Sequence, residues 1–87
     1  MTETRFADLW SRETLSFRER RLLLLGLLVG QGGLDEEIVI QLDAGLRSGE
    51  LTAEELREIV SFLTHYAGWS RGARLNAQVE DLIERTS

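Results

Sequence analysis

The sequence contains no cysteine, no proline and no lysine, and it has a single histidine. Without a thiol, the chain has no disulfide, no thiolate metal site and no cysteine nucleophile. One histidine also excludes a metal site built from several histidines of one chain. Because all ten basic residues are arginine, Schiff-base chemistry by a lysine is excluded as well. We therefore expect a protein without a metal ion or another cofactor.

Acidic residues outnumber basic ones, and the formal net charge is -5. Because binding to phosphates needs a basic face, nucleic acid is not expected as a partner. The first ten residues lack the basic segment and apolar run that mark a signal peptide. The longest apolar run is also too short to cross a bilayer, which needs roughly 20 residues. We expect a cytoplasmic protein that binds neither nucleic acid nor a membrane.

The longest apolar run is Leu22–Val29, in which every residue is apolar or glycine. A helix with one buried side shows polar residues every three or four positions. About two helical turns without a polar residue therefore predict a helix that is buried on all sides. A domain of 87 residues has little material to surround such a helix, and no disulfide supports it. We expect another subunit to supply part of the cover.

Apolar residues recur at helical spacing along the chain, without useful alternation of the β type, which predicts an all-α protein. Two capping boxes, Ser16 with Glu19 and Thr52 with Glu55, indicate helix starts. The predicted helices are Thr4–Arg12, one from Ser16 to about Val29, one capped by Asp35, one from Thr52 to Gly68 and one capped by Ser70. Residues 1–87 then form one domain, a compact bundle of about five helices.

Glu37 and Gln41 are four residues apart, which places them on one side of their helix. A carboxylate beside an amide can hold a substrate carboxyl or carbonyl group, and a buried Glu37 can act as a general base. The same pattern is also typical of acidic residues that stabilise the positive end of a helix dipole. Both interpretations remain open from the spacing alone.

Three further features have a functional and a structural interpretation. His65 is the one side chain whose unperturbed pKa lies near neutrality, so it is a candidate acid or base, or an exposed structural residue. The segment Arg18–Arg21 holds three arginines, which can bind a ligand carboxylate or form a solvated face. Trp10 and Trp69 flank loops, where they can line a pocket or pack in the core or an interface.

Three blocks of the chain read FADLWSRETLSFRERRLLLLGLL, EEIVIQLDAGLRSGELTAEELREIV and YAGWSRGARLNAQVEDLI. In their order and spacing, these blocks resemble the carboxymuconolactone decarboxylase family. In the family, the second block typically contains ALxxGLTxEEIxEV and the third reads YAGxPxAxxAxxxAxEV. The resemblance covers nearly the whole chain and is to the γ-carboxymuconolactone decarboxylase branch. It implies an alkylhydroperoxidase-D-like all-α fold that assembles as a homotrimer or hexamer.

The chain also departs from the family at positions that matter for chemistry. The thiol branch uses a Cys-x-x-Cys pair with an upstream glutamate, but this chain has no cysteine and Arg21 stands at that glutamate position. Peroxidase and disulfide-reductase activities are therefore not expected. The decarboxylase branch typically has a glutamate followed four residues later by a histidine. Glu37 matches the glutamate, Gln41 stands at the histidine position, Phe62 replaces another histidine, and Arg20 matches a recurrent arginine.

The resemblance implies cofactor-independent lyase, lactone or enol chemistry on a small carboxylated metabolite, as in the catabolism of aromatic compounds. The candidate site then consists of the acid/base Glu37, the proton donor His65, the carboxylate-binding Arg20, the hydrogen-bond donor Gln41, and Trp10 and Trp69, which line the pocket. The alternative is a non-catalytic oligomeric scaffold or binding subunit that kept the fold after losing the family histidine.

Overall fold

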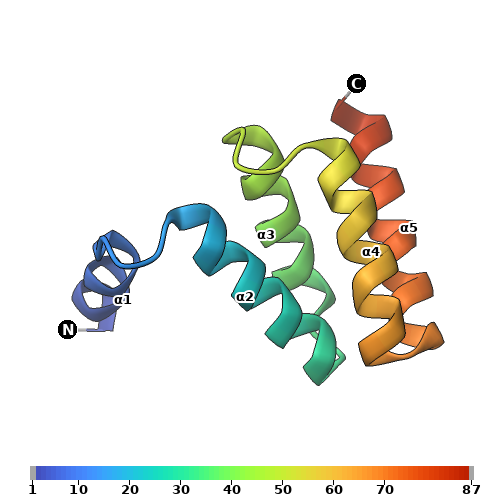
Figure 1. Ribbon diagram of the computed structural model, residues 1–87, viewed down its shortest axis with the longest axis horizontal. Coiled ribbons are helices and arrows are strands. Elements are labelled where there is room, and N and C mark those ends of the chain that lie inside the picture. The colour runs from blue at the N-terminus through green and yellow to red at the C-terminus, as the bar shows by residue number, and fades with distance from the viewer. Residues whose placement is uncertain (1, 87) are drawn as a thin grey trace.

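A computed structural model describes residues 2–86, with side chains from Phe6 onward. This part of the chain folds into five α-helices without a β-strand, as Figure 1 shows. The helices are α1 (Thr2–Ser11), α2 (Phe17–Gln31), α3 (Asp35–Arg47), α4 (Ala53–Ala67) and α5 (Trp69–Thr86). The prediction of an all-α bundle is confirmed for the described residues.

Both predicted capping boxes are present. At the start of α2, the Ser16 hydroxyl accepts a hydrogen bond from the Glu19 amide at 3.0 Å, and the Glu19 carboxylate accepts one from the Ser16 amide at 2.8 Å. Thr52 and Glu55 form the same pair of bonds at the start of α4, at 3.1 and 2.9 Å. These bonds satisfy amide groups that the first helical turn leaves without a partner.

The other two predicted caps are wrong. Asp35 is the first residue of α3 rather than its cap, and its carboxylate forms an ion pair with Arg74 of α5 at 2.6 Å. Helix α5 already begins at Trp69, so Ser70 lies within it. The backbone of Gly68 has a φ of 99°, a conformation that favours glycine, and it reverses the chain between α4 and α5 within one residue.

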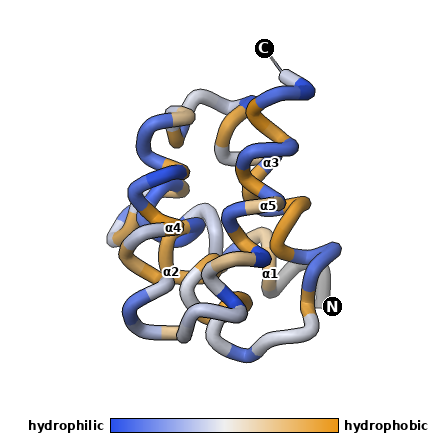
Figure 2. Tube along the Cα trace, turned by 90° about the vertical axis from the view of Figure 1, so that its right-hand side faces the viewer, coloured by the Kyte–Doolittle hydropathy of each residue, from blue (hydrophilic) through white to orange (hydrophobic). Residues whose placement is uncertain are grey.

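The core lies where α2, α3, α4 and α5 meet, and α4 and α5 run side by side along one flank (Figure 1). Hydrophobic and hydrophilic segments alternate along the helices, as Figure 2 shows, and each of these four helices contributes one side to the core. The buried apolar residues are Leu25, Leu28, Val29, Ile38, Leu42, Leu51, Leu56, Val60, Leu75, Val79 and Leu82.

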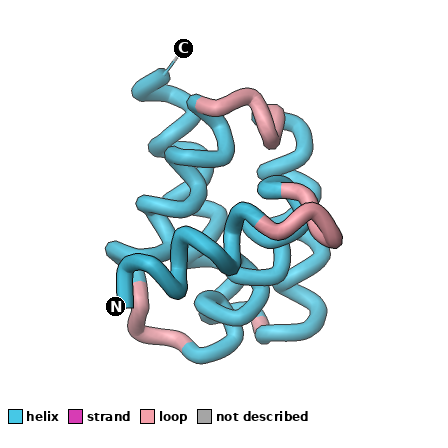
Figure 3. The backbone as a smooth tube through the Cα atoms, turned by 90° about the vertical axis from the view of Figure 1, so that its left-hand side faces the viewer, coloured by secondary structure: helices cyan, strands magenta, loops and turns pink. Residues whose placement is uncertain are grey.

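One chain does not bury α2 on all sides. Its inward side carries the buried Leu25, Leu28 and Val29, but on its outward side Leu23 is 66% exposed and Leu27 is 55% exposed. Helix α1 lies at one end of the molecule instead of covering this side (Figures 1 and 3). The apolar run predicted from the sequence to be fully sheltered is therefore half sheltered within a single copy.

The contact between α4 and α5 makes a prediction about stability. A Cβ atom at Gly72 of α5 would lie 2.7 Å from Thr64 Cβ and 2.8 Å from Thr64 Cγ2. We expect Gly72→Ala to lower the free energy of unfolding by about 1–3 kcal/mol, because the two helices must separate to admit the methyl group. Urea unfolding followed by circular dichroism measures this loss. Gly30→Ala is the matched control, since no atom lies within 4 Å of its Cβ position. Equal losses in both variants would contradict the close packing.

Candidate functional site

A polar network joins α2 to α3 and to the turn before α4. Arg21 of α2 donates from Nε to Glu50 Oε1 at 2.6 Å and from Nη1 to Gln41 Oε1 at 2.5 Å. The side chains of Arg21 and Glu50 are only 13% and 18% exposed. The Arg21 guanidinium also lies 5.2 Å from the centroid of the Trp10 ring, within the range of a cation–π interaction. We call Arg21, Gln41 and Glu50 the Arg21 network.

The backbone of α3 leaves room for this network at Gly45. A Cβ atom there would lie 3.1 Å from Arg21 Cδ and 2.9 Å from Leu51 Cδ1. The hydrogen bond from Arg21 is the largest influence on Glu50, and it holds the pKa of that carboxyl below its ordinary value of 4.5. Glu50 therefore stays ionised at neutral pH and neutralises the half-buried arginine.

Glu50 was not predicted as a site residue, because its partner lies 29 residues away and no local pattern signals the contact. The family pattern held a usable signal. Where the pattern reads GLT, this chain reads Gly49-Glu50-Leu51-Thr52, with one additional residue.

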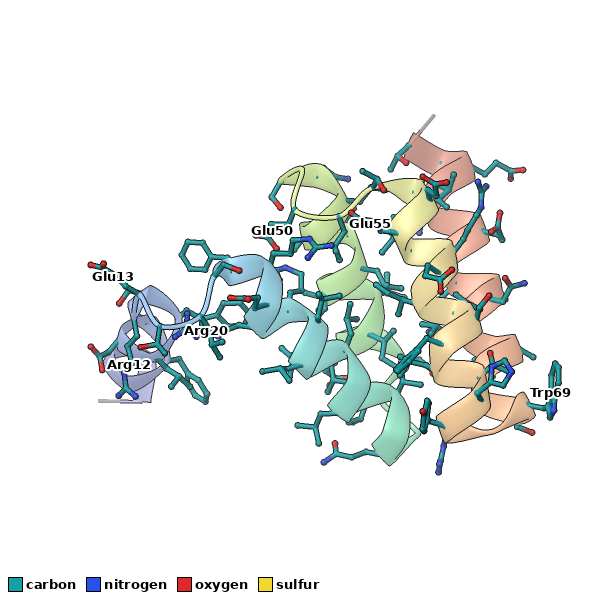
Figure 4. All side chains as sticks on the ribbon, in the orientation of Figure 1. Arg12, Glu13, Arg20, Glu50, Glu55 and Trp69 are labelled. Atoms are coloured by element: carbon teal, nitrogen blue, oxygen red, sulfur yellow. The ribbon has the colours of Figure 1, made fainter. Side chains whose placement is uncertain are left out.

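Arg20, the predicted carboxylate-binding residue, contacts the backbone between α1 and α2. Its Nη1 donates to the carbonyl oxygens of Arg12 at 2.9 Å and Trp10 at 3.4 Å, and also to that of Leu15. Figure 4 shows Arg20 beside this connection. The arginine thereby fixes where α1 lies relative to α2.

Glu37 and His65 lie on different helices, and both are exposed. The Glu37 carboxylate forms no hydrogen bond or ion pair with another described residue, so it is solvated. His65 Nδ1 lies 2.8 Å from the Ser61 carbonyl oxygen of the preceding turn. In the neutral ring this contact places the proton on Nδ1 and leaves the Nε2 lone pair open.

A groove of about 340 Å³ between α4 and α5 is lined by His65 and Trp69, with Thr64 and Asn76. Trp69 lies at the opposite end of the molecule from Arg20 (Figure 4). The structure therefore divides the six predicted site residues. Trp10, Arg20 and Gln41 lie around the start of α2 and the Arg21 network, His65 and Trp69 line the α4/α5 groove, and Glu37 is in solvent.

The described residues hold neither a metal-ion cluster nor a membrane span. No group of three or more histidine, aspartate and glutamate side chains in residues 6–86 is arranged to hold a metal ion. Within the same part of the chain, no helix combines the length and apolar character that a membrane span needs.

The Arg21 network makes a prediction about acid stability. We expect Glu50→Gln to lower the free energy of unfolding by about 1–3 kcal/mol at neutral pH, because it leaves a half-buried guanidinium without its counter-charge. The folded-state pKa of Glu50 is lowered, so its contribution is present above the ordinary value of 4.5 and is lost as pH falls through the folded-state pKa. The difference between wild type and variant should therefore shrink in acid, which urea titrations across pH can measure.

Glu80→Gln is the matched control for this substitution. Glu80 pairs with Arg57 at 2.9 Å, but both side chains are about half exposed, so a smaller loss is expected. A Glu50 variant no less stable than the Glu80 variant at neutral pH would show that the Arg21 network does not hold the helices together.

Comparison with known proteins assigns the family. No curated protein and no solved structure matches the chain. A family model does match it, over residues 1–81, and its description is "Carboxymuconolactone decarboxylase family". Because the match spans nearly all of the chain, this protein belongs to the carboxymuconolactone decarboxylase family.

Proposed function

We propose that this chain is an assembling, non-catalytic subunit that has replaced the glutamate–histidine chemistry of its family by a structural contact. The observation that carries the proposal is the position of Gln41. This residue stands where the decarboxylase branch typically has a histidine, and its side-chain oxygen accepts a 2.5 Å hydrogen bond from Arg21.

An amide and an imidazole differ in what they can do at this position. Imidazole gains and loses a proton near neutral pH, whereas an amide only donates and accepts hydrogen bonds. Arg21 is itself held by Glu50, so Gln41 is part of a network that links α2 to α3. This environment supports a structural role for Gln41 in place of proton transfer to a substrate.

The surface of the chain supports the assembling part of the proposal. Large apolar side chains are exposed on several helices, and soluble monomers rarely leave extended apolar areas open to water. Those on α1, α2 and α4 are Phe6, Leu9, Phe17, Leu23, Leu27, Phe62 and Tyr66. A homotrimer or hexamer, as the family resemblance implies, would cover such residues.

A second candidate function is lyase chemistry on a small carboxylated metabolite. The open Nε2 of His65, in a groove that Trp69 also lines, favours it, because a neutral imidazole can accept a proton there. Glu37 and His65 do not line a common groove in one chain. In this case Glu37 of one copy must meet the α4/α5 groove of another.

The two candidates predict different outcomes with 4-carboxymuconolactone as the test substrate. For wild type, Glu37→Gln and His65→Gln, we expect decarboxylation at the rate of the protein-free solution, followed by ultraviolet absorbance and release of CO₂. Turnover by wild type would contradict the proposed function. If wild type turned over the substrate and both variants did not, the second candidate function, lyase chemistry, would be established with Glu37 and His65 as its catalytic residues.

A further inference from the structure

Helix α1 lacks sufficient cover within its own chain. It has ten residues, and isolated helices shorter than about 12–15 residues are marginal in water. Phe6 and Leu9 are exposed on it. Its anchor in the same chain is Trp10 near its end, whose ring stacks on Phe17 and lies over Arg21. A partner that covers Phe6 and Leu9 would therefore stabilise this helix.

The connection to α2 keeps α1 from folding onto the rest of its own bundle. Arg20 of α2 donates to two carbonyl oxygens of this connection, those of Arg12 and Leu15, and to that of Trp10 in α1. Helix α1 is thereby held beside α2 at the end of the molecule that is remote from α4 and α5 (Figures 1 and 4). Its exposed side is available to another molecule.

The same chain has an unfilled apolar groove between α2 and α4. We call it the α2/α4 groove; it has a volume of about 410 Å³. Its apolar lining includes Leu23, Gly26, Leu27, Ile59 and Phe62. Leu23 and Leu27 also line a notch of about 400 Å³ between α1 and α2, together with Phe6 and Leu9 of α1. The apolar side of α1 therefore lies across an open notch from the two leucines that the α2/α4 groove shares with it.

Gly26 marks the α2/α4 groove as a place of close approach. Glycine inside a helix is less stable than alanine, so its presence in the middle of α2 needs a reason. The packing of this chain offers none, since no atom lies within 4 Å of the Cβ position of Gly26. By contrast, Gly45 and Gly72 make room for side chains of their own chain. A helix from outside that lies against the groove would use the space at Gly26.

The apolar side of α1 and the α2/α4 groove match in length. Phe6 and Leu9 are separated by about 4.5 Å along the axis of α1, and Leu23 and Leu27 by about 6 Å along α2, so each side presents about one turn. Asp8 of α1 pairs with Arg12, the residue after the helix, at 3.2 Å. Phe6 of α1 and Phe62 of the groove are 58% and 59% exposed, so each surface leaves a large apolar side chain in contact with water.

We propose that α1 of one copy packs into the α2/α4 groove of another copy of this chain. The occupant is a second copy because the uncovered helix and the unfilled groove lie on the same molecule. Each contact between two copies covers α1 of one copy and the α2/α4 groove of the other. The proposal rests on the assembling function proposed above and specifies its interface. Repeated around a closed ring or between two copies, the contact leaves neither surface open.

The first test compares the masses of single variants of the full chain. We expect Leu9→Lys in α1 and Phe62→Glu in the groove each to raise the dissociation constant of the assembly by roughly tenfold or more, since each buries a charge in an apolar contact. Ile40→Glu is the control. Ile40 lies on α3, outside both surfaces, and its exposed fraction of 61% equals that of Phe62 within a few per cent. Sedimentation equilibrium over a range of concentrations measures all four proteins.

The second test mixes the two disrupted variants. In a mixed contact, the cation introduced by Leu9→Lys faces the carboxylate introduced by Phe62→Glu, and the other contact pairs native Leu9 with native Phe62. We expect the equimolar mixture to reach a higher mass than either variant alone, because every contact between unlike copies is either native or pairs opposite charges, and this gain also shows that both variants are folded. A mixture that stays monomeric, variants that assemble like wild type, or equal dissociation of the Ile40 control would overturn this interface. A wild type that is monomeric at every concentration would overturn the assembling function as well.

Discussion

Helix α2 carries apolar residues on two sides, but the rest of the chain packs against only one of these sides. Leu25, Leu28 and Val29 face α3, α4 and α5 and organise the core. Leu23 and Leu27 face outward, between the notch beside α1 and the α2/α4 groove. Within the described residues both side chains stay more than half exposed, so the described helices do not cover them. The positions of α1 and of both hollows follow from this unequal cover.

In the proposed function, the Arg21 network is a structural contact at positions that the family resemblance associates with chemistry. By that resemblance, Arg21 stands at a glutamate position of the thiol branch and Gln41 at a histidine position of the decarboxylase branch, and in this chain Arg21 donates a hydrogen bond to Gln41. Glu50 supplies the counter-charge, and Gly45 gives the space. One fold can serve different functions, so membership of the family is compatible with a subunit whose role is assembly.

Local interactions were predictable from the sequence, whereas long-range ones were not. The capping boxes that begin at Ser16 and Thr52 join residues only three positions apart. The helical spacing of apolar residues is a local property as well. Asp35 was expected to cap α3, but Arg74 of α5 binds its carboxylate. Arg20 likewise contacts backbone carbonyls that a sequence pattern does not reveal. The predicted site residues lie in different parts of the fold for the same reason. The spacing of residues within one helix does not show which other helix those residues face.

The central claim is that α1 and the outward side of α2 are completed by another copy. Hydrogen–deuterium exchange at several protein concentrations tests it most directly, since α1 should gain protection only when copies associate. The account predicts that amide exchange within residues 2–11 slows as concentration rises, while the buried stretches of α4 and α5 exchange slowly throughout. Exchange in α1 that is the same at all concentrations would contradict it.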